Sequence, residues 1–334
     1  MRLLVVNYHY ISDRENEYPH GGIFPITVKK LTQQMEELSK IFTFISQDDI
    51  IDAIKSGGLL PGNSCLITFD DGLSCQYNKA LPILEKMGIP AIFFVTGYPY
   101  DKDHDGVLLA HKIHWCQACI PPDDFLRAIS INYKKCTGED FIVDKFDIPE
   151  ELIKKQYNFG DLATSKFKFA LNHYMEETLK VKIIDPIFSA LVNDNLKEFA
   201  DGFYLSATEI SNLHKKNYLG IHGYSHNSFA YMNADEIERD ISKCLKIFKD
   251  IVGEDTPNIS SISYPRGGLP AGDCLAKLVE VLNRRNIKIG FTTSKQINVD
   301  FSNPLMISRF DANYAPHGKS EIIKIIDNDF YINV

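Results

Sequence analysis

The chain has 334 residues, which is enough for one large α/β domain or two ordinary ones. Its composition, 44% hydrophobic and 24% charged, is ordinary for a soluble globular protein. A net charge of −8 gives no general attraction to phosphate backbones, so nucleic acid is not expected as a partner.

The N-terminal segment and the cysteines bear on the compartment. Residues 1–20 hold only a short apolar run and lack the small-residue cleavage site of a signal peptide. No apolar run approaches the roughly 20 residues needed to span a bilayer, so no transmembrane segment is expected. The 7 cysteines are scattered and odd in number, which favours reduced thiols, and the sequence predicts a cytoplasmic protein.

In chain order, short apolar runs rich in β-formers alternate with helical patterns. Such runs suit parallel strands that are covered on both faces. Helices are expected at 27–40, 78–88, 206–216 and 233–253. Strand alternating with helix predicts an α/β fold, and up to eight strands suggest a barrel rather than an open sheet. The expected strands are residues 3–9, 42–45, 65–71, 91–97, 218–223, 259–265, 287–293 and 304–310.

Residues 101–205 break this alternation. They are rich in Lys, Asp, Asn and aromatic residues, and their longer patterns indicate helices, for example at 166–181. We therefore expect a single barrel domain over residues 1–334 with a helical insertion at 101–205. Its "HKIHWCQAC" run could indicate a zinc site, since Cys-x-x-Cys lies beside histidines. No second Cys-x-x-Cys follows, so a structural helix is favoured. The four metal-type residues of that run are His111, His114, Cys116 and Cys119.

Two adjacent carboxylates, Asp70 and Asp71, end the strand-like run "LITFDDG". Like charges repel, so a buried pair needs a cation or a shared proton, whereas a solvated turn is the alternative. His222 and His226 end another run, four residues apart, a spacing that lets two imidazoles share a metal. Two surface histidines in a loop would look the same. Together, an Asp and two His suit a divalent metal with positions open for water, and its charge would keep both carboxylates ionised.

A third segment, "SYPRGG" at 263–268, also follows an apolar run. Such a turn can aim backbone N–H groups into a site, although a plain turn is the better reading in isolation. In this order, "TFDDG", "HGYSH" and "SYPRGG" resemble the motifs of the polysaccharide deacetylase family, carbohydrate esterase family four. The first motif matches without change, and in the second Gly223 stands where the family has Ser or Thr. The resemblance covers about 1–100 and 205–315.

The resemblance implies a distorted (β/α) barrel of about seven to eight parallel strands, with the site at their C-terminal ends. It implies that Asp71, His222 and His226 hold a metal, which activates a water for attack on an amide carbonyl. It implies that Asp70 is the catalytic base and that the backbone N–H of Arg266 is an oxyanion donor.

The chain departs from the family at two places. Ser263 stands where other members carry the arginine that orients the catalytic aspartate, and we expect Arg309, at the end of the last strand, to substitute for it. The family's late Leu-x-His motif, the source of its usual general acid, is not recognisable. The one later histidine, His317, is a weak candidate for that role, because a loop histidine is more often simply solvated. We also expect His9 and Tyr264 to line the substrate site, with a buried structural role as the alternative for His9.

The sequence therefore predicts a metal-dependent hydrolase that removes an N-acyl group from an amino sugar. An acetyl group is the first expectation. Zinc fits two histidines and a carboxylate, and cobalt, nickel or manganese could occupy the same ligands. A cytoplasmic address would make the substrate a precursor in surface polysaccharide or glycolipid biosynthesis. Two alternatives remain: an amidase of the same fold that acts on a non-sugar amide, and a carbohydrate-binding barrel that has lost catalysis.

Overall fold

The computed structural model describes residues 2–58, 60–145, 148–151, 153, 166, 169–253, 258–326 and 329–332. The chain divides into two compact units. The first contains Met1–Glu15, Pro25–Gly106 and Ala200–Val334. The second contains Asn16–Phe24 and Val107–Phe199, so it takes up most of the predicted insertion together with a short piece of the N-terminal region.

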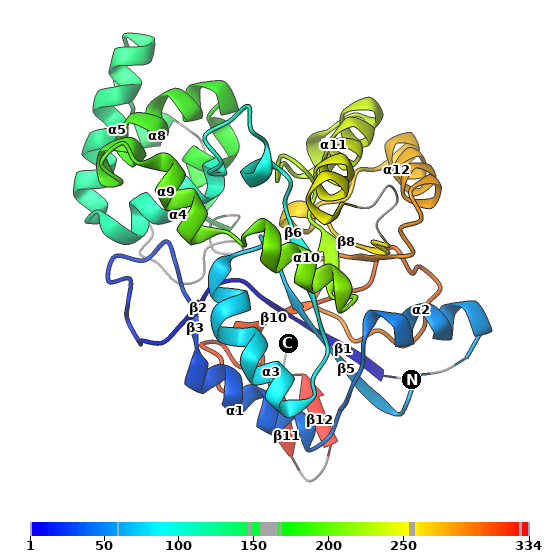
Figure 1. The fold of residues 1–334 in the computed structure, drawn as a ribbon. Coiled ribbons are helices and arrows are strands. Elements are labelled where there is room, and N and C mark those ends of the chain that lie inside the picture. Colours follow the sequence, from blue (N-terminus) through cyan, green and yellow to red (C-terminus); the bar gives the residue numbers. More distant parts are fainter. Residues whose placement is uncertain are drawn as a thin grey trace. The chain divides into compact units, whose positions relative to one another are not determined.

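One sheet of eight strands, all parallel, forms the centre of the first unit (Figure 1). Its hydrogen-bonded order is β10-β1-β5-β6-β7-β8-β9, and β4 pairs with β5. Each of the eight predicted runs contains or overlaps a strand, the last of them at Phe310 alone. The bounds are β1 (Arg2–Tyr8), β4 (Thr43–Phe44), β5 (Asn63–Phe69), β6 (Ala91–Val95), β7 (Leu219–Ile221), β8 (Ser261–Ser263), β9 (Ile289–Phe291) and β10 (Phe310–Asp311).

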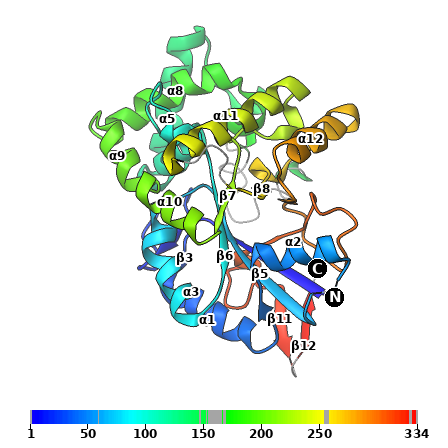
Figure 2. The ribbon, with the colours of Figure 1, turned by 45° about the vertical axis from the view of Figure 1, so that its right-hand side comes forward.

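The sheet curls, so that strands distant in its order face each other across an apolar interior. Alternate residues of a strand point to opposite faces. Val5, Leu66, Phe94 and Phe291 share one inner cluster, and the rings of Phe94 and Phe291 lie 5.4 Å apart although β7 and β8 separate their strands. Two views of the sheet are given in Figure 1 and Figure 2. The distorted (β/α) barrel predicted from the sequence is confirmed.

Helices pack against the outer face of the curled sheet and close its core. The outer cluster joins strand residues such as Val6, Phe69 and Phe93 to apolar residues of these helices. The helices of the outer layer are α1 (Val28–Ser39), α3 (Leu81–Met87), α10 (Ala207–Lys215), α11 (Ala234–Val252) and α12 (Gly272–Arg284). The helices α10 and α11 each begin with a capping box: Ser206 accepts from the N–H of Glu209, and Asn233 accepts from that of Glu236. A further helix, α2 (Gln47–Ser56), packs on the inner cluster.

Short elements complete the first unit. The pair β2 (Ile11–Ser12) and β3 (Ile26–Thr27) is parallel, and β11 (Ile323–Ile326) pairs antiparallel with β12 (Asp329–Ile332). The short helical turns are η1 (Gln76–Ala80), η2 (Tyr98–Tyr100), η5 (Phe229–Tyr231), η6 (Pro265–Gly267) and η7 (Ala312–Tyr314).

The second unit is helical. Its helix α8 (Glu177–Leu191) contacts both α4 (Leu109–Cys119) and α5 (Pro122–Thr137), and α9 (Leu196–Phe203) leads the chain back into the first unit. The helix predicted over 166–181 is wrong in its continuity: η4 (Ala170–Tyr174) is followed by extended backbone before α8 begins. Residues 167 and 168 of that prediction lie outside the described residues. The short turn η3 is Val143–Lys145.

The "HKIHWCQAC" run is helix α4, as predicted. Its residue His111 is fully buried, and Lys112 pairs with Asp185 of α8 at 2.9 Å between Nζ and Oδ1. A lysine that is itself nearly buried needs such a partner. The run therefore holds helices together within this unit.

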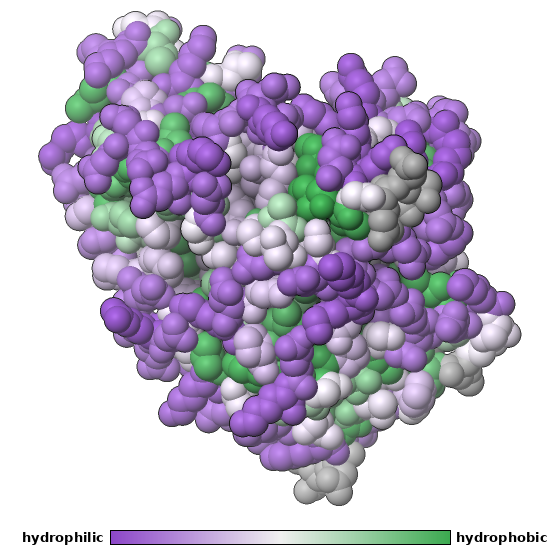
Figure 3. Space-filling view, viewed as in Figure 1, coloured by the Kyte–Doolittle hydropathy of each residue, from purple (hydrophilic) through white to green (hydrophobic). Residues whose placement is uncertain are grey.

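The surface in the view of Figure 3 is largely hydrophilic, with hydrophobic residues in small patches. Among the described residues, no helix combines the length and the apolar character that a bilayer crossing requires.

Candidate active site

Polar side chains replace apolar ones where the strands of the barrel end. On β1, the alternation that turns Leu3 and Val5 inward turns Asn7 inward as well. The same reasoning applies after β5, β6, β7 and on β8. The residues that reach this end of the barrel interior are Asn7, Asp70, Thr96, His222 and Ser263, each 4% exposed or less.

Arg309 and Asp70 form a buried, bidentate ion pair at this end of the barrel interior. The Nη1 and Nη2 atoms of Arg309 each donate to one carboxylate oxygen of Asp70, at 2.8 Å. Nη2 also donates to the Oγ of Ser263 at 2.7 Å, and Nε donates to the carbonyl of Thr292 at 3.1 Å. The amide of Asn7 donates to Asp70 Oδ2 at 3.0 Å. The structure thus brings Arg309 to the side chain that we expected it to orient.

This environment fixes the charge of Asp70. Burial alone would raise the pKa of its carboxyl, but the Arg309 guanidinium, with smaller contributions from His222 and His9, holds that pKa well below its usual range. Asp70 is therefore a carboxylate throughout the physiological pH range.

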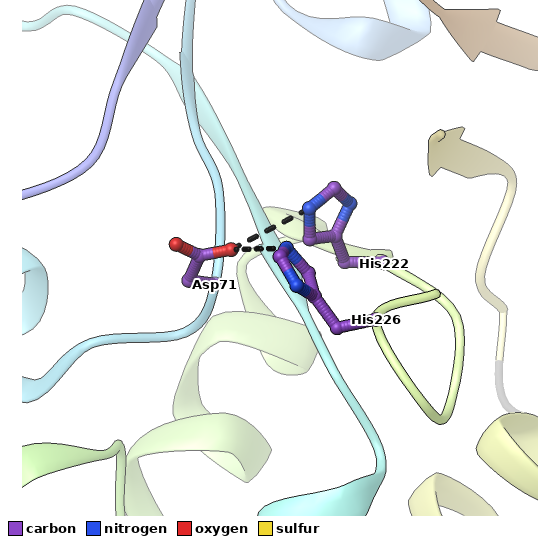
Figure 4. A group of neighbouring side chains, drawn as sticks. All are labelled: Asp71, His222 and His226. Atoms are coloured by element: carbon purple, nitrogen blue, oxygen red, sulfur yellow. Dashed lines mark ion pairs between the residues drawn. The ribbon is translucent and has the colours of Figure 1, made fainter. Parts of the chain in front are cut away.

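Asp71 points toward His222, which directly follows β7, and toward His226 in the loop beyond it (Figure 4). Its Oδ1 atom lies 3.5 Å from Nε2 of His222 and 3.2 Å from Nε2 of His226. The Nδ1 atom of His222 lies 2.8 Å from the carbonyl of Ser263, which accepts only if Nδ1 carries the proton. Burial lowers the pKa of His222, so a neutral ring with a free Nε2 lone pair is favoured.

A left-handed turn lets both aspartates lie near His222. Adjacent residues of a regular strand would point to opposite faces. Asp71 has φ +79°, and at Gly72, with φ +68°, a Cβ atom would lie 2.6 Å from Cγ1 of Val95. Buried Gln76 holds this turn in place, because its Nε2 donates to the carbonyl of Asp70 at 2.5 Å and to that of His9 at 3.0 Å. The Asp-Asp-Gly sequence thus needs its glycine and an anchoring amide.

The three residues fit a divalent metal. Their ligand atoms all lie within 4.8 Å of one another, and one carboxylate with two neutral imidazoles is a donor set suited to zinc and neighbouring transition metals. In the described part of the chain this is the only such group of three, so the residues of α4 do not form a second one.

Comparison with known proteins finds one family model that matches part of the chain. The family model described as polysaccharide deacetylase matches residues 58–120, which include the "TFDDG" motif. The predicted resemblance to the polysaccharide deacetylase family is thereby confirmed over these residues. Among curated protein sequences, none matches the chain.

Several solved structures share the fold. The Streptococcus pyogenes deacetylase PplD, in complex with acetate, has a TM-score of 0.54 at 14% identity, with 96% of each chain covered. IcaB from Ammonifex degensii has a TM-score of 0.51 at 17% identity, with 92% of this chain and 91% of that chain covered. A de-N-acetylase from Aggregatibacter actinomycetemcomitans has a TM-score of 0.51 at 13% identity, with 93% and 96% covered.

The remaining predicted site residues lie as follows. Arg266 is exposed on η6 and has a left-handed backbone, with φ +57°. His9 is half-buried and near enough to Asp70 to help lower the pKa of its carboxyl. His317 lies in an exposed turn, where its N–H donates to Glu321.

Tyr264 needs a correction. Its side chain is 1% exposed, and its hydroxyl donates to the carbonyl of Leu305 at 2.8 Å. The ring packs within the outer core cluster, near Phe229. A side chain so enclosed offers no surface to a substrate, because the inner and outer faces of a strand alternate and Ser263 already takes the inner one.

Proposed function

We propose that this protein is a metal-dependent N-deacetylase that hydrolyses the N-acetyl group of an amino sugar. The observation that carries the proposal is the pairing of two unlike aspartates at one strand end. Arg309 compensates the charge of Asp70 and orients its carboxylate, while Asp71 faces His222 and His226. One carboxylate is thus arranged to handle a proton and the other to bind a cation.

Asp71, His222 and His226 would hold the metal. When bound, a divalent metal lowers the pKa of water and polarises a carbonyl oxygen. Asp70 accepts the proton that the attacking water loses, and the two bonds from Arg309 fix the direction of its oxygens. The low pKa of Asp70 keeps it ionised but makes it a weak base, so Arg309 secures orientation at the cost of basicity. The backbone N–H of Arg266 is the proposed donor to the oxyanion.

The substrate class rests on the family and on the fold. The deacetylase and de-N-acetylase among the similar structures make an acetyl group on an amino sugar the first choice, and zinc is the first choice of metal. We keep a surface polysaccharide or glycolipid precursor as the proposed substrate. This finer proposal depends on the cytoplasmic address, which stays a prediction.

Four variants test the roles of the site. Asp71→Ala, His222→Ala and His226→Ala should each lower zinc affinity, since each removes one of three protein ligands. Asp70→Asn should retain zinc and lose about 10²–10⁴ in turnover, because an amide does not accept the proton. His20→Ala, at an exposed position in the second unit, is the matched control.

The measurements are zinc per chain and acetate release from N-acetylated sugars, nucleotide sugars and simple amides. Release from simple amides alone would favour the amidase alternative, and zinc binding without any release would favour the inactive barrel. Zinc loss in Asp70→Asn with retention in Asp71→Ala would reverse the two roles.

A further inference from the structure

An acidic side chain lies on the apolar face of α11. The buried face of this helix carries Ile237, Ile241, Cys244 and Phe248, and Asp240 falls among them at 5% exposure. Burying a carboxylate is costly unless its oxygens accept hydrogen bonds. The partners of Asp240 therefore show what the helix gains from carrying an acid there.

In the described part of the chain, the hydrogen-bond donors to Asp240 all belong to the loop between the two metal-site histidines. Its Oδ1 accepts from the backbone N–H of Tyr224 at 2.6 Å. Its Oδ2 accepts from the N–H of Ser225 at 2.9 Å and from the Ser225 hydroxyl at 2.6 Å. The same hydroxyl oxygen accepts from the N–H of Asn227 at 3.2 Å, which extends the support past His226.

The loop needs this support because its backbone is unusual. His226 has φ +62°, a left-handed conformation that is unfavourable for a residue with a side chain. Such a conformation persists only where surrounding contacts determine it. The hydrogen bonds to Asp240 and Ser225 bracket this residue and hold its imidazole toward Asp71.

Gly223 is the counterpart of Asp240. Its φ is +70°, and a Cβ atom there would lie 2.7 Å from Oδ1 of Asp240, closer than real contacts allow. The family motif has Ser or Thr at this position, so the glycine is a departure that opens the space for the helix carboxylate. The two residues form a matched pair from separate elements.

We propose that Asp240 is a positioning residue that sets the metal loop, residues 222–226, in its binding conformation before the metal arrives, with Gly223 making room for it. The inference rests on the proposed metal-binding function. A loop already in place pays less conformational entropy when it binds, so Asp240 raises metal affinity without touching the metal. Loss of partners of this kind lowers metal affinity by about 10–100-fold.

The test compares zinc dissociation constants, measured by competition with a chromophoric chelator on folded protein. Asp240→Asn should raise the constant about 10–100-fold, because its NH₂ group faces N–H donors. Ser225→Ala, which removes only the hydroxyl, should raise it less. The Asp240→Asn/Ser225→Ala double variant should show less than the product of the two single effects, because they share one contact. Asp250→Asn, an exposed charge change on the same helix, should leave the constant unchanged.

Urea unfolding of each metal-free variant separates this role from plain stabilisation. A purely structural Asp240 would lower the unfolding midpoint but leave the zinc constant of the folded protein at the wild-type value, and that result would overturn the inference alone. If Asp240→Asn does not fold, a wild-type zinc constant in Ser225→Ala would overturn it. A wild-type chain that binds no zinc, cobalt, nickel or manganese would overturn the proposed function as well.

Discussion

Replacing Arg309 with methionine should leave the Asp70 carboxylate buried without its cation. Methionine keeps an unbranched apolar stem but donates no hydrogen bond. The side chains of the pair are 1% and 4% exposed, so water cannot take over the role of the guanidinium. Removing one partner of a buried ion pair costs about 3–5 kcal/mol of unfolding free energy, which corresponds to roughly 2–4 pKa units at the remaining group.

The deficit should depend on pH in a defined direction. In the wild type, the folded-state pKa of Asp70 lies below the unfolded value of about 3.9, so its stabilising contribution is present above that pH and is lost only as the pH falls through the folded pKa. In Arg309→Met, burial raises the folded-state pKa above the unfolded one. Ionisation of Asp70 then removes stability as the pH rises from about 4 through the raised pKa, by up to about 1.4 kcal/mol per pH unit.

The assay is urea unfolding of metal-free protein, with chelator present, from pH 4 to pH 8. Arg284→Met is the control, because the pair of Arg284 with Glu238 has side chains that are 60% and 39% exposed. Its loss should cost about 0–1 kcal/mol at every pH. If Arg309→Met lowers the unfolding free energy by the same amount at pH 4 and at pH 8, the reasoning is refuted. Arg309 would then not act by compensating the charge of Asp70.

Three further substitutions test packing around the site. Gly72→Ala should lower the unfolding free energy by about 1–3 kcal/mol, measured in urea, because it adds strain at positive φ and a contact with Val95. Tyr264→Phe should cost about 1–3 kcal/mol by leaving the carbonyl of Leu305 without its donor, while KM stays unchanged; a raised KM would restore a substrate contact. Thr96→Val should raise the urea midpoint, since the buried Thr96 hydroxyl has no hydrogen-bond partner among the described residues, and a lower midpoint would mean that water or a ligand bonds it.

The sequence predicted the strands well because buried parallel strands are short, continuous apolar runs. It failed where backbone chemistry overrides composition. The run 304–310 is apolar, but only Phe310–Asp311 is a strand, and Ile307 makes an isolated bridge to Phe291. Proline at 304 has no N–H to donate to a ladder, so regular pairing cannot extend through it. The helix α2 was missed because it is only ten residues long.

The site was predictable where spacing along the chain carries the information. Asp70, Asp71 and the histidine pair are local motifs, and their positions at strand ends place them at one end of the barrel. Asp240 and Gln76 were missed because their partners are fixed only by the fold. The sequence did contain a signal for Asp240. It follows Ile237 by three residues, so it is an acid in the apolar stripe of its helix.

The span of Arg309 has a consequence for how the protein matures. Its guanidinium joins the carbonyl after β9, the serine of β8, the asparagine of β1 and an aspartate 239 residues earlier in the chain. Contacts of such long range form only after much loop-closure entropy has been lost. A chain still being synthesised, with β10 not yet made, can hold the metal-site residues but cannot compensate the Asp70 charge. On the proposed function, a chain truncated before Arg309 would fold without the partner of Asp70 and would release no acetate.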